Sequence, residues 1–226
     1  MNSEELFDAF RSDIVDTATP YLWTEDEVTR YADAAYRMFV RLTGGIADFT
    51  SSATQIDIVA GEATAEMAPS ILRVMSAYRA SDGVEIIVAN LTDAAFMRSS
   101  DYNIVRQLYN DTRPGPVNYM VIGTQPDVCK WVQIPSEDDV ASLNVYRLPL
   151  THITDGTHEL SEVKEDHHTY LLDWMKHLAY KKQDAETFDR SKSNEHKTNF
   201  ENYCAFCKTE WERYKHKTRV VQYGGL

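Results

Sequence analysis

The sequence predicts an α+β protein, a helical bundle of about four helices with a β-strand-rich insertion between the N-terminal and C-terminal helices. Two amphipathic helical patterns come first, roughly a hundred residues of alternating patterns and Pro-containing turns follow, and a mostly helical stretch comes last. The expected parts are the N-terminal helices at 1–45, the insertion at 46–150, the C-terminal helices at 151–217 and an extended tail at 218–226.

The first helix is expected over residues 3–16, where Leu6, Phe10 and Ile14 recur every four residues and form one apolar stripe. Ser3 is the predicted N-cap, because Glu4 and Glu5 then occupy the first turn, where the helix dipole favours anions.

A second and stronger helix is predicted to start at Thr24. The run Thr24-Glu25-Asp26-Glu27 is a capping box, in which the Thr24 hydroxyl and the Glu27 carboxylate satisfy backbone amides reciprocally. Apolar residues then follow at spacings of three and four up to Leu42, and Gly44-Gly45 ends the pattern.

The middle of the chain changes to the period of β-strands. Two hairpins are expected, each from two alternating segments joined by a turn. A short helix and a final strand complete the prediction. The expected strands are 55–59, 71–79, 84–88, 119–123, 129–134 and 143–148, and the expected short helix is 97–109.

Composition excludes several classes of protein. No apolar run approaches the roughly 20 residues that span a bilayer, and the acidic start of the chain is unlike a signal peptide, so we expect a protein made in a cytosol. The three cysteines do not form the framework of a secreted protein. The net charge of −12 disfavours a sequence-reading DNA binder, but it is compatible with a protein that surrounds DNA without gripping it.

Two motifs have the residue types and spacing of metal or redox sites. Cys204 and Cys207 form a C-x-x-C pair, but they lie on the apolar stripe of a predicted helix, where buried core thiols are the better interpretation. Glu165 and His168 form a single Glu-x-x-His, whereas di-iron bundles use two. The sequence therefore predicts no catalytic residue, no metal and no cofactor, with a metal-dependent enzyme built on His167, His168 and the cysteines as the alternative.

Aromatic residues crowd more than one face of the C-terminal helices. A helix in a monomer buries one stripe, so aromatic residues outside that stripe favour a subunit interface, where such residues are enriched. The alternative is a large core with some aromatic residues at its surface. The candidate interface residues are Trp174, Tyr180, Phe206, Trp211 and Tyr214.

The last residues of the chain alternate between polar and apolar after a basic helix end. This pattern suits strand addition to the sheet edge of a partner, and a frayed terminus is the alternative. The residues that would bind are Arg219, Val220, Val221, Tyr223 and Leu226.

Several segments together resemble the head-to-tail adaptor proteins of tailed bacteriophages. The resemblance covers most of the chain, and it lies in the order of the predicted elements and in short sequence segments. The segments that carry it are Thr24–Leu42, Gly83–Leu91, Pro114–Ile134, Leu172–Glu186 and Glu210–Lys215.

The resemblance implies a structural virion protein at the head–tail junction, made in the host bacterial cytoplasm, and no enzyme. It implies a homo-oligomeric ring, dodecameric in the family, that docks under the portal, extends the DNA channel and provides the platform for tail attachment. The implied partners are the portal protein, tail tube, nozzle or tail-completion proteins, and double-stranded DNA that passes without sequence-specific binding, with no membrane. The C-terminal tail would be the portal-binding segment. Another tail-completion or DNA-packaging ring component is the alternative.

Overall fold

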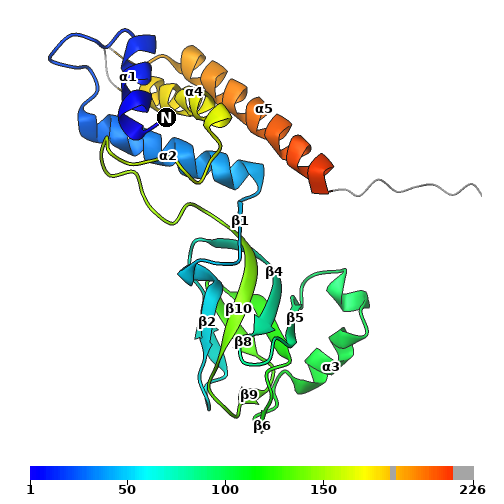
Figure 1. The fold of residues 1–226 in the computed structure, drawn as a ribbon. Helices are drawn as coiled ribbons and strands as arrows, with labels where there is room; N and C mark the ends of the chain where they lie inside the picture. Colours follow the sequence, from blue (N-terminus) through cyan, green and yellow to red (C-terminus); the bar gives the residue numbers. More distant parts are fainter. Residues whose placement is uncertain (184–186, 216–226) are drawn as a thin grey trace, which may run out of the picture. The chain divides into compact units, whose positions relative to one another are not determined.

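The computed structural model describes residues 1–183 and 187–215, with the side chains described as far as Arg213. The chain forms two compact units. The helical unit comprises residues 1–44 and the C-terminal part from Pro149, and the β unit comprises residues 45–148. The predicted fold class, α+β with a strand-rich insertion between N-terminal and C-terminal helices, is confirmed (Figure 1).

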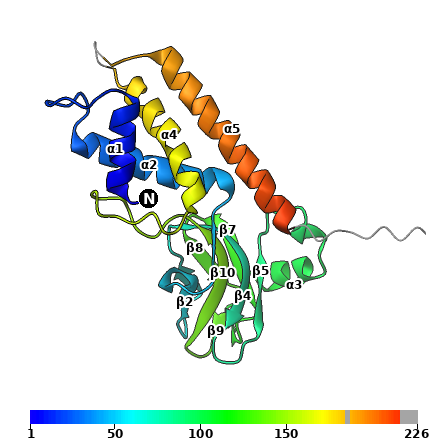
Figure 2. The same cartoon turned by 45° about the horizontal axis from the view of Figure 1, so that its top comes forward.

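Four α-helices form the described part of the helical unit (Figures 1 and 2). They are α1 (Ser3–Asp13), α2 (Glu25–Thr43), α4 (His168–Lys181) and α5 (Arg190–Lys215), and the short 3-10 helix η3 (Glu165–His167) precedes α4. Helix α5 is the longest, at 26 residues, or about 39 Å at 1.5 Å per residue. Among the described residues, no helix combines the length and apolar character needed to cross a bilayer.

The start of α2 agrees with the sequence prediction, whereas the N-cap of α1 differs from it. The capping box of α2 is present as predicted, because Thr24 accepts from the amide of Glu27 and Glu27 accepts from the amide of Thr24. The predicted N-cap of α1 is wrong. Asn2 is the cap, with its own capping box to Glu5. An Asn side chain one residue earlier reaches the same free amides, so Ser3 becomes the first helical residue.

The core of the bundle is formed by the stripes that the sequence pattern indicates. Helices α1, α2 and α5 each pack against α4, and α2 also packs against α1 and α5. The residues that fill this core are fully or almost fully buried: Leu6, Phe10, Val28, Ala32, Ala35, Tyr36, Phe39, Leu171, Met175, Ala179, Phe200 and Cys204.

The β unit contains one curled sheet of eight strands and a two-stranded parallel pair, β6 (Pro114–Gly115) with β9 (Ile134–Pro135). The strands of the large sheet are β1 (Ile46–Asp48), β2 (Gln55–Ile58), β3 (Thr64–Glu66), β4 (Ile71–Arg79), β5 (Glu85–Ala89), β7 (Tyr119–Gln125), β8 (Val128–Trp131) and β10 (Asp139–Arg147). The remaining elements of the unit are the 3-10 helices η1 (Ser52–Thr54) and η2 (Phe96–Arg98) and the helix α3 (Asp101–Leu108).

The order of strands in the sheet is β1-β10-β4-β5-β7-β8-β3, with β2 also paired to β10. Both predicted hairpins are present, β4 with β5 and β7 with β8. Strands β5 and β7 are parallel, and the chain crosses between them through α3. One face of the sheet encloses a core around Trp131, which is 1% exposed, while Val105 of α3 packs in a smaller cluster with Val121 and Val132.

The insertion closes on itself where its first and last strands pair. Strand β1 is antiparallel to the end of β10, with Ile46 opposite Arg147 and Asp48 opposite Val145. The side chains of Asp48 and Arg147 form a buried ion pair, and Asp48 also accepts from the amides of Thr50 and Ser51. Burial opposes ionisation of Asp48, but these hydrogen bonds outweigh it and hold the pKa of this carboxyl well below its usual range.

Gly45 is required at the entry to this ladder. Its φ is +92°, in the left-handed region, and a Cβ atom there would lie 2.9 Å from the Cβ of Tyr146. Any side chain at position 45 therefore meets both backbone strain and a clash with the neighbouring strand.

The substitution Asp48→Asn is expected to destabilise the protein by about 3–5 kcal/mol, because it removes the carboxylate from a buried ion pair. Urea unfolding of the full chain measures this. The ion pair of Asp111 with the exposed side chain of Arg113 provides the control. Asp111→Asn should leave the unfolding midpoint unchanged, and an equal loss in both variants would contradict the assignment.

The same carboxyl predicts a pH dependence. Because the pKa of Asp48 is lower in the folded protein than in the unfolded chain, its contribution to stability is present above the unfolded-state pKa of about 4 and is lost as pH falls through the folded value. Between pH 6 and pH 3, the free energy of unfolding of the wild type should therefore fall more steeply than that of Asp48→Asn. Parallel curves would show that Asp48 does not carry this effect.

Candidate interaction surface

Helices α4 and α5 run antiparallel and are joined by a ladder of aromatic contacts. The rings of Tyr170 and Tyr203 stack with centroids 3.4 Å apart, and Trp174 lies 5.0 Å from Phe200. At the other end of the helix pair, Tyr180 stacks on His196 at 5.9 Å. Offset and stacked rings stabilise such a pair beyond the area that they bury.

The five predicted interface residues differ in exposure. Trp174 and Tyr180 are half-buried within the helix pair, and Tyr180 also meets the Trp23 ring edge-on at 6.5 Å. Phe206 is 56% exposed and Trp211 is 42% exposed. The side chain of Tyr214 lies outside the described residues. The role of these five residues in a subunit interface stays a prediction.

The exposed members belong to a larger group that we call the aromatic surface: Tyr170, Tyr203, Phe206 and Trp211. Tyr170 is 41% exposed, and Tyr203 stacks on both Tyr170 and Phe206. Large aromatic side chains left uncovered on adjoining helices are typical of a surface that binds another protein.

A pocket of about 530 Å³ adjoins the aromatic surface at the end of α5. It is lined by Lys164, Asp166, His167, Glu210 and Trp211. The ammonium group of Lys164 lies 5.5 Å from the centre of the Trp211 ring, within range of a cation–π contact. The described lining therefore combines one aromatic ring with charges of both signs.

His167 connects this pocket to the aromatic surface. Its Nδ1 lies 2.9 Å from the Tyr203 hydroxyl oxygen, and its ring is 5.2 Å from that of Phe39. Burial lowers the pKa of His167, so the imidazole is predominantly neutral at pH 7. Burial likewise raises the pKa of the Tyr203 hydroxyl, which stays protonated. The pair is thus a neutral hydrogen bond that fixes two rings.

The C-x-x-C motif forms part of the bundle core. Cys204 and Cys207 are each 1% exposed, and burial raises the pKa of both thiols, that of Cys204 to about 12. Protonated thiols are poor nucleophiles and poor metal ligands. Cys129 in β8 is also buried, and burial raises its pKa to about 11.

The histidines of the alternative metal site are occupied by structural contacts. His168 is 3% exposed, and its Nε2 lies within hydrogen-bond distance of the carbonyl oxygens of Leu160 and Val163. Nowhere in the described ranges do three or more His, Cys, Asp or Glu side chains converge in a way that would hold a metal ion.

Sequence reasoning missed part of the aromatic surface. Tyr170 is not among the five predicted interface residues, whereas it is exposed and stacked on Tyr203. Its place at the first turn of α4, where the stripe has only begun, is the signal that distinguishes it. The predicted tail residues Arg219, Val220, Val221, Tyr223 and Leu226 lie outside the described residues.

Comparison with protein families identifies the class of protein to which this fold and surface belong. Residues 1–212 match the family model of the SU10 adaptor protein. The chain therefore belongs to the SU10 adaptor protein family, a family of phage head-to-tail adaptors, as the sequence resemblance predicted. A search of the curated proteins gives no match. The matched range ends before the predicted portal-binding tail.

Burial of the thiols predicts slow chemical modification. At pH 7 and in the native state, a thiol reagent should label Cys204 and Cys207 at least about a hundredfold more slowly than in the urea-unfolded chain, because both side chains are buried and protonated. Mass spectrometry after timed labelling measures the two rates. Rapid labelling of either thiol in the native protein would revive the redox or metal interpretation.

Proposed function

We propose that this protein forms the homo-oligomeric ring, a dodecamer, that docks under the phage portal, extends the DNA channel and carries the tail. The family match over residues 1–212 carries this proposal, because it gives the role of head–tail adaptor. The exposed aromatic surface supports the oligomeric part, since a soluble subunit that leaves Phe206 and Trp211 uncovered gains by burying them against another protein.

The charge of the chain supports the passage of DNA. The net charge is −12, and acidic residues outnumber basic ones in the β unit as well as in the whole chain. An acidic wall repels phosphate and avoids the counterion release that makes basic proteins adhere to DNA. A channel of this kind lets double-stranded DNA slide without sequence-specific binding.

The ring needs only one repeated contact between two different faces of the subunit. Heterologous contacts of this type close into a ring when the rotation per subunit divides the circle. The portal protein, the tail tube or nozzle and the tail-completion proteins are then the partners on the two faces of the ring. The tail from residue 218 onward is the proposed portal-binding segment, with Val220 and Val221 as its apolar anchors.

Light scattering tests the ring. The mass of the purified chain is measured alone and after mixing with the portal protein of the same phage. A mass near twelve times the 25.9 kDa of the subunit, in either sample, is the expected result. A monomer in both samples, with no mass shift on mixing, would overturn the proposed function.

Removal of residues 218–226 tests the tail. The truncated protein should keep its fold and its thermal unfolding temperature, because the described bundle core ends at Cys207, and it should lose portal binding. The double substitution of Val220 and Val221 by Asp should have the same effect, with Gln222→Ala as the control. Portal binding that survives the truncation would assign docking to another surface.

A further inference from the structure

We propose that the 15–22 loop of one copy docks on the aromatic surface of the next copy, which names both sides of the contact that closes the ring. This inference rests on the proposed function. The 15–22 loop is the segment that joins α1 to α2, and its exposed apolar side chains are Val15, Tyr21 and Leu22. Several observations on the helical unit lead to it.

The first observation is the backbone of Val15. Its φ is +59°, in the left-handed region, although it is a β-branched residue. The amide of Val15 donates to the carbonyl of Ser12 and the amide of Asp16 donates to that of Arg11, which is the Schellman arrangement at a helix end. The position of Val15 in this arrangement normally takes Gly or Asn.

The side chain of Val15 does not repay this backbone cost within the subunit. It is 81% exposed, more than any other large apolar side chain among the described residues. A residue held in a sparsely populated conformation with its apolar side chain in solvent points to a role outside the subunit. An apolar contact in the assembly would supply the missing burial.

The loop is held firmly by a buried ion pair. Asp16 is 3% exposed, and its carboxylate accepts from the guanidinium of Arg11 at 2.8 Å and from the backbone amides of Leu22 and Trp23. Arg11 also donates to the carbonyl of Trp23. The two ends of the loop are thereby tied to one anion, so the exposed side chains keep fixed positions, and docking costs little ordering entropy.

The chemistry of the loop suits an aromatic partner. In residues 14–24 the only charged side chain is Asp16, which is already buried and paired. Docking of the loop therefore buries no unpaired charge of its own, the main penalty at apolar interfaces. The exposed side chains of the loop are Val15, Tyr21 and Leu22, and their apolar surface can cover the exposed rings of Phe206 and Trp211.

The segment that joins α1 to α2 and the C-terminal end of α5 lie at opposite ends of the helical unit (Figures 1 and 2). Trp23, at the end of the loop, contacts Tyr180, and Tyr180 stacks on His196 near the start of α5. Trp211 lies fifteen residues further along the same helix, which is about 22 Å at 1.5 Å per residue. A loop therefore cannot reach the aromatic surface of its own chain, but it can reach that of a neighbour.

A second copy is the occupant that uses both surfaces equally. Each subunit carries one loop and one aromatic surface, so each contact around a closed ring consumes one of each and leaves none exposed.

The substitution Val15→Asn separates assembly from folding. Asn tolerates the left-handed backbone, so the unfolding temperature of the subunit should rise, while the concentration needed for half-assembly of the ring should increase about tenfold, since the apolar contact is lost. Val84→Asn, which alters another exposed valine in the β unit, is the matched control and should leave assembly unchanged. Unchanged assembly of Val15→Asn overturns the inference.

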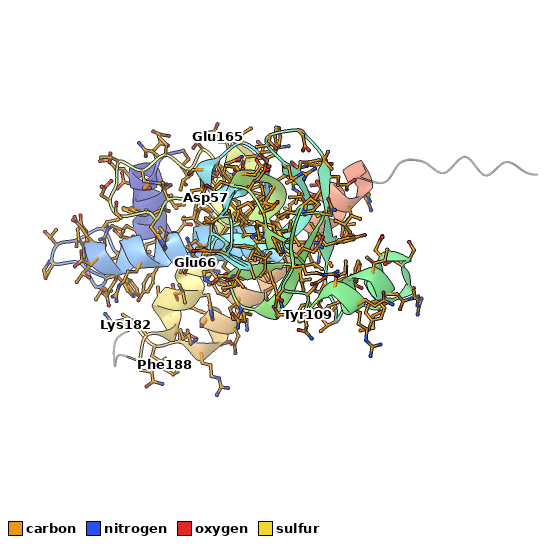
Figure 3. The ribbon with its side chains drawn as sticks, turned by 90° about the horizontal axis from the view of Figure 1, so that it is seen from below. Asp57, Glu66, Tyr109, Glu165, Lys182 and Phe188 are labelled. Carbon is orange, nitrogen blue, oxygen red and sulfur yellow. The ribbon has the colours of Figure 1, made fainter. Side chains whose placement is uncertain are left out.

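Cross-linking gives a test that does not depend on stability. A Leu22→Cys protein is mixed with a Phe206→Cys protein, with and without the portal, and treated with a short bismaleimide. A cross-linked dimer of the two variants is expected, and the buried native thiols should not react. Phe188→Cys replaces Phe206→Cys in the control, because Phe188 is 51% exposed but lies before the start of α5, at the opposite end from the aromatic surface (Figure 3).

The outcomes distinguish this inference from the proposed function. A ring of the expected mass without the Leu22–Phe206 cross-link, or with an equal yield from the Phe188 control, overturns the docking of the loop and leaves the adaptor ring in place. The absence of any ring, with or without portal, overturns the proposed function and the inference with it.

Discussion

The pairing of β1 with the end of β10 is the constraint on which the rest of the structure depends. It joins residues about a hundred positions apart, and it places the two ends of the insertion side by side, with Ile46 opposite Arg147. The buried pair of Asp48 and Arg147 fixes the register, because a slip of one residue would turn both charges out of their contact. Because the two ends of the insertion meet in this ladder, the chain leaves the helical unit after α2 and returns to it before α4 at neighbouring points. Such a long-range closure is costly in loop entropy, which the ladder and the ion pair offset.

Local features of the fold were predictable because they depend on neighbours in sequence. The capping box of Thr24, the stop at Gly44 and the two hairpins all follow from side chains within a few residues of one another. The parallel pairing of β5 with β7 was not predicted, since no short-range pattern reports which strands meet across α3. The end of α1 was placed beyond its true position for a different reason. The apolar stripe continues through Ile14, but the left-handed backbone at Val15 breaks the helix, and a valine there gives no sequence signal of a helix end.

The candidate surface was likewise predictable only in part from the sequence. An excess of aromatic residues on the C-terminal helices was visible in the sequence, and Phe206 and Trp211 are indeed exposed. The sequence pattern did not distinguish these exposed residues from Trp174, which is half-buried against Phe200. The 3.6-residue helical period fits the exposed and the half-buried aromatic residues equally well. Which side of an aromatic helix meets solvent is decided by where the neighbouring helix ends. The position of the neighbouring helix is a tertiary feature, and it determines which of the aromatic residues form the exposed surface.

Helix α5 extends past the helices that support it. Cys207 is the last buried residue among the described side chains of α5, and every side chain from Lys208 to Arg213 is exposed. A free helical segment of this length is marginal in water, so it depends on its continuity with the packed turns before it. A partner that binds at Trp211 buries a side chain that is 42% exposed in the subunit, and it also lengthens the part of the helix that is firmly supported. The supported length of α5 therefore depends on what binds near Trp211, so a partner at this position also sets how much of the helix is rigid.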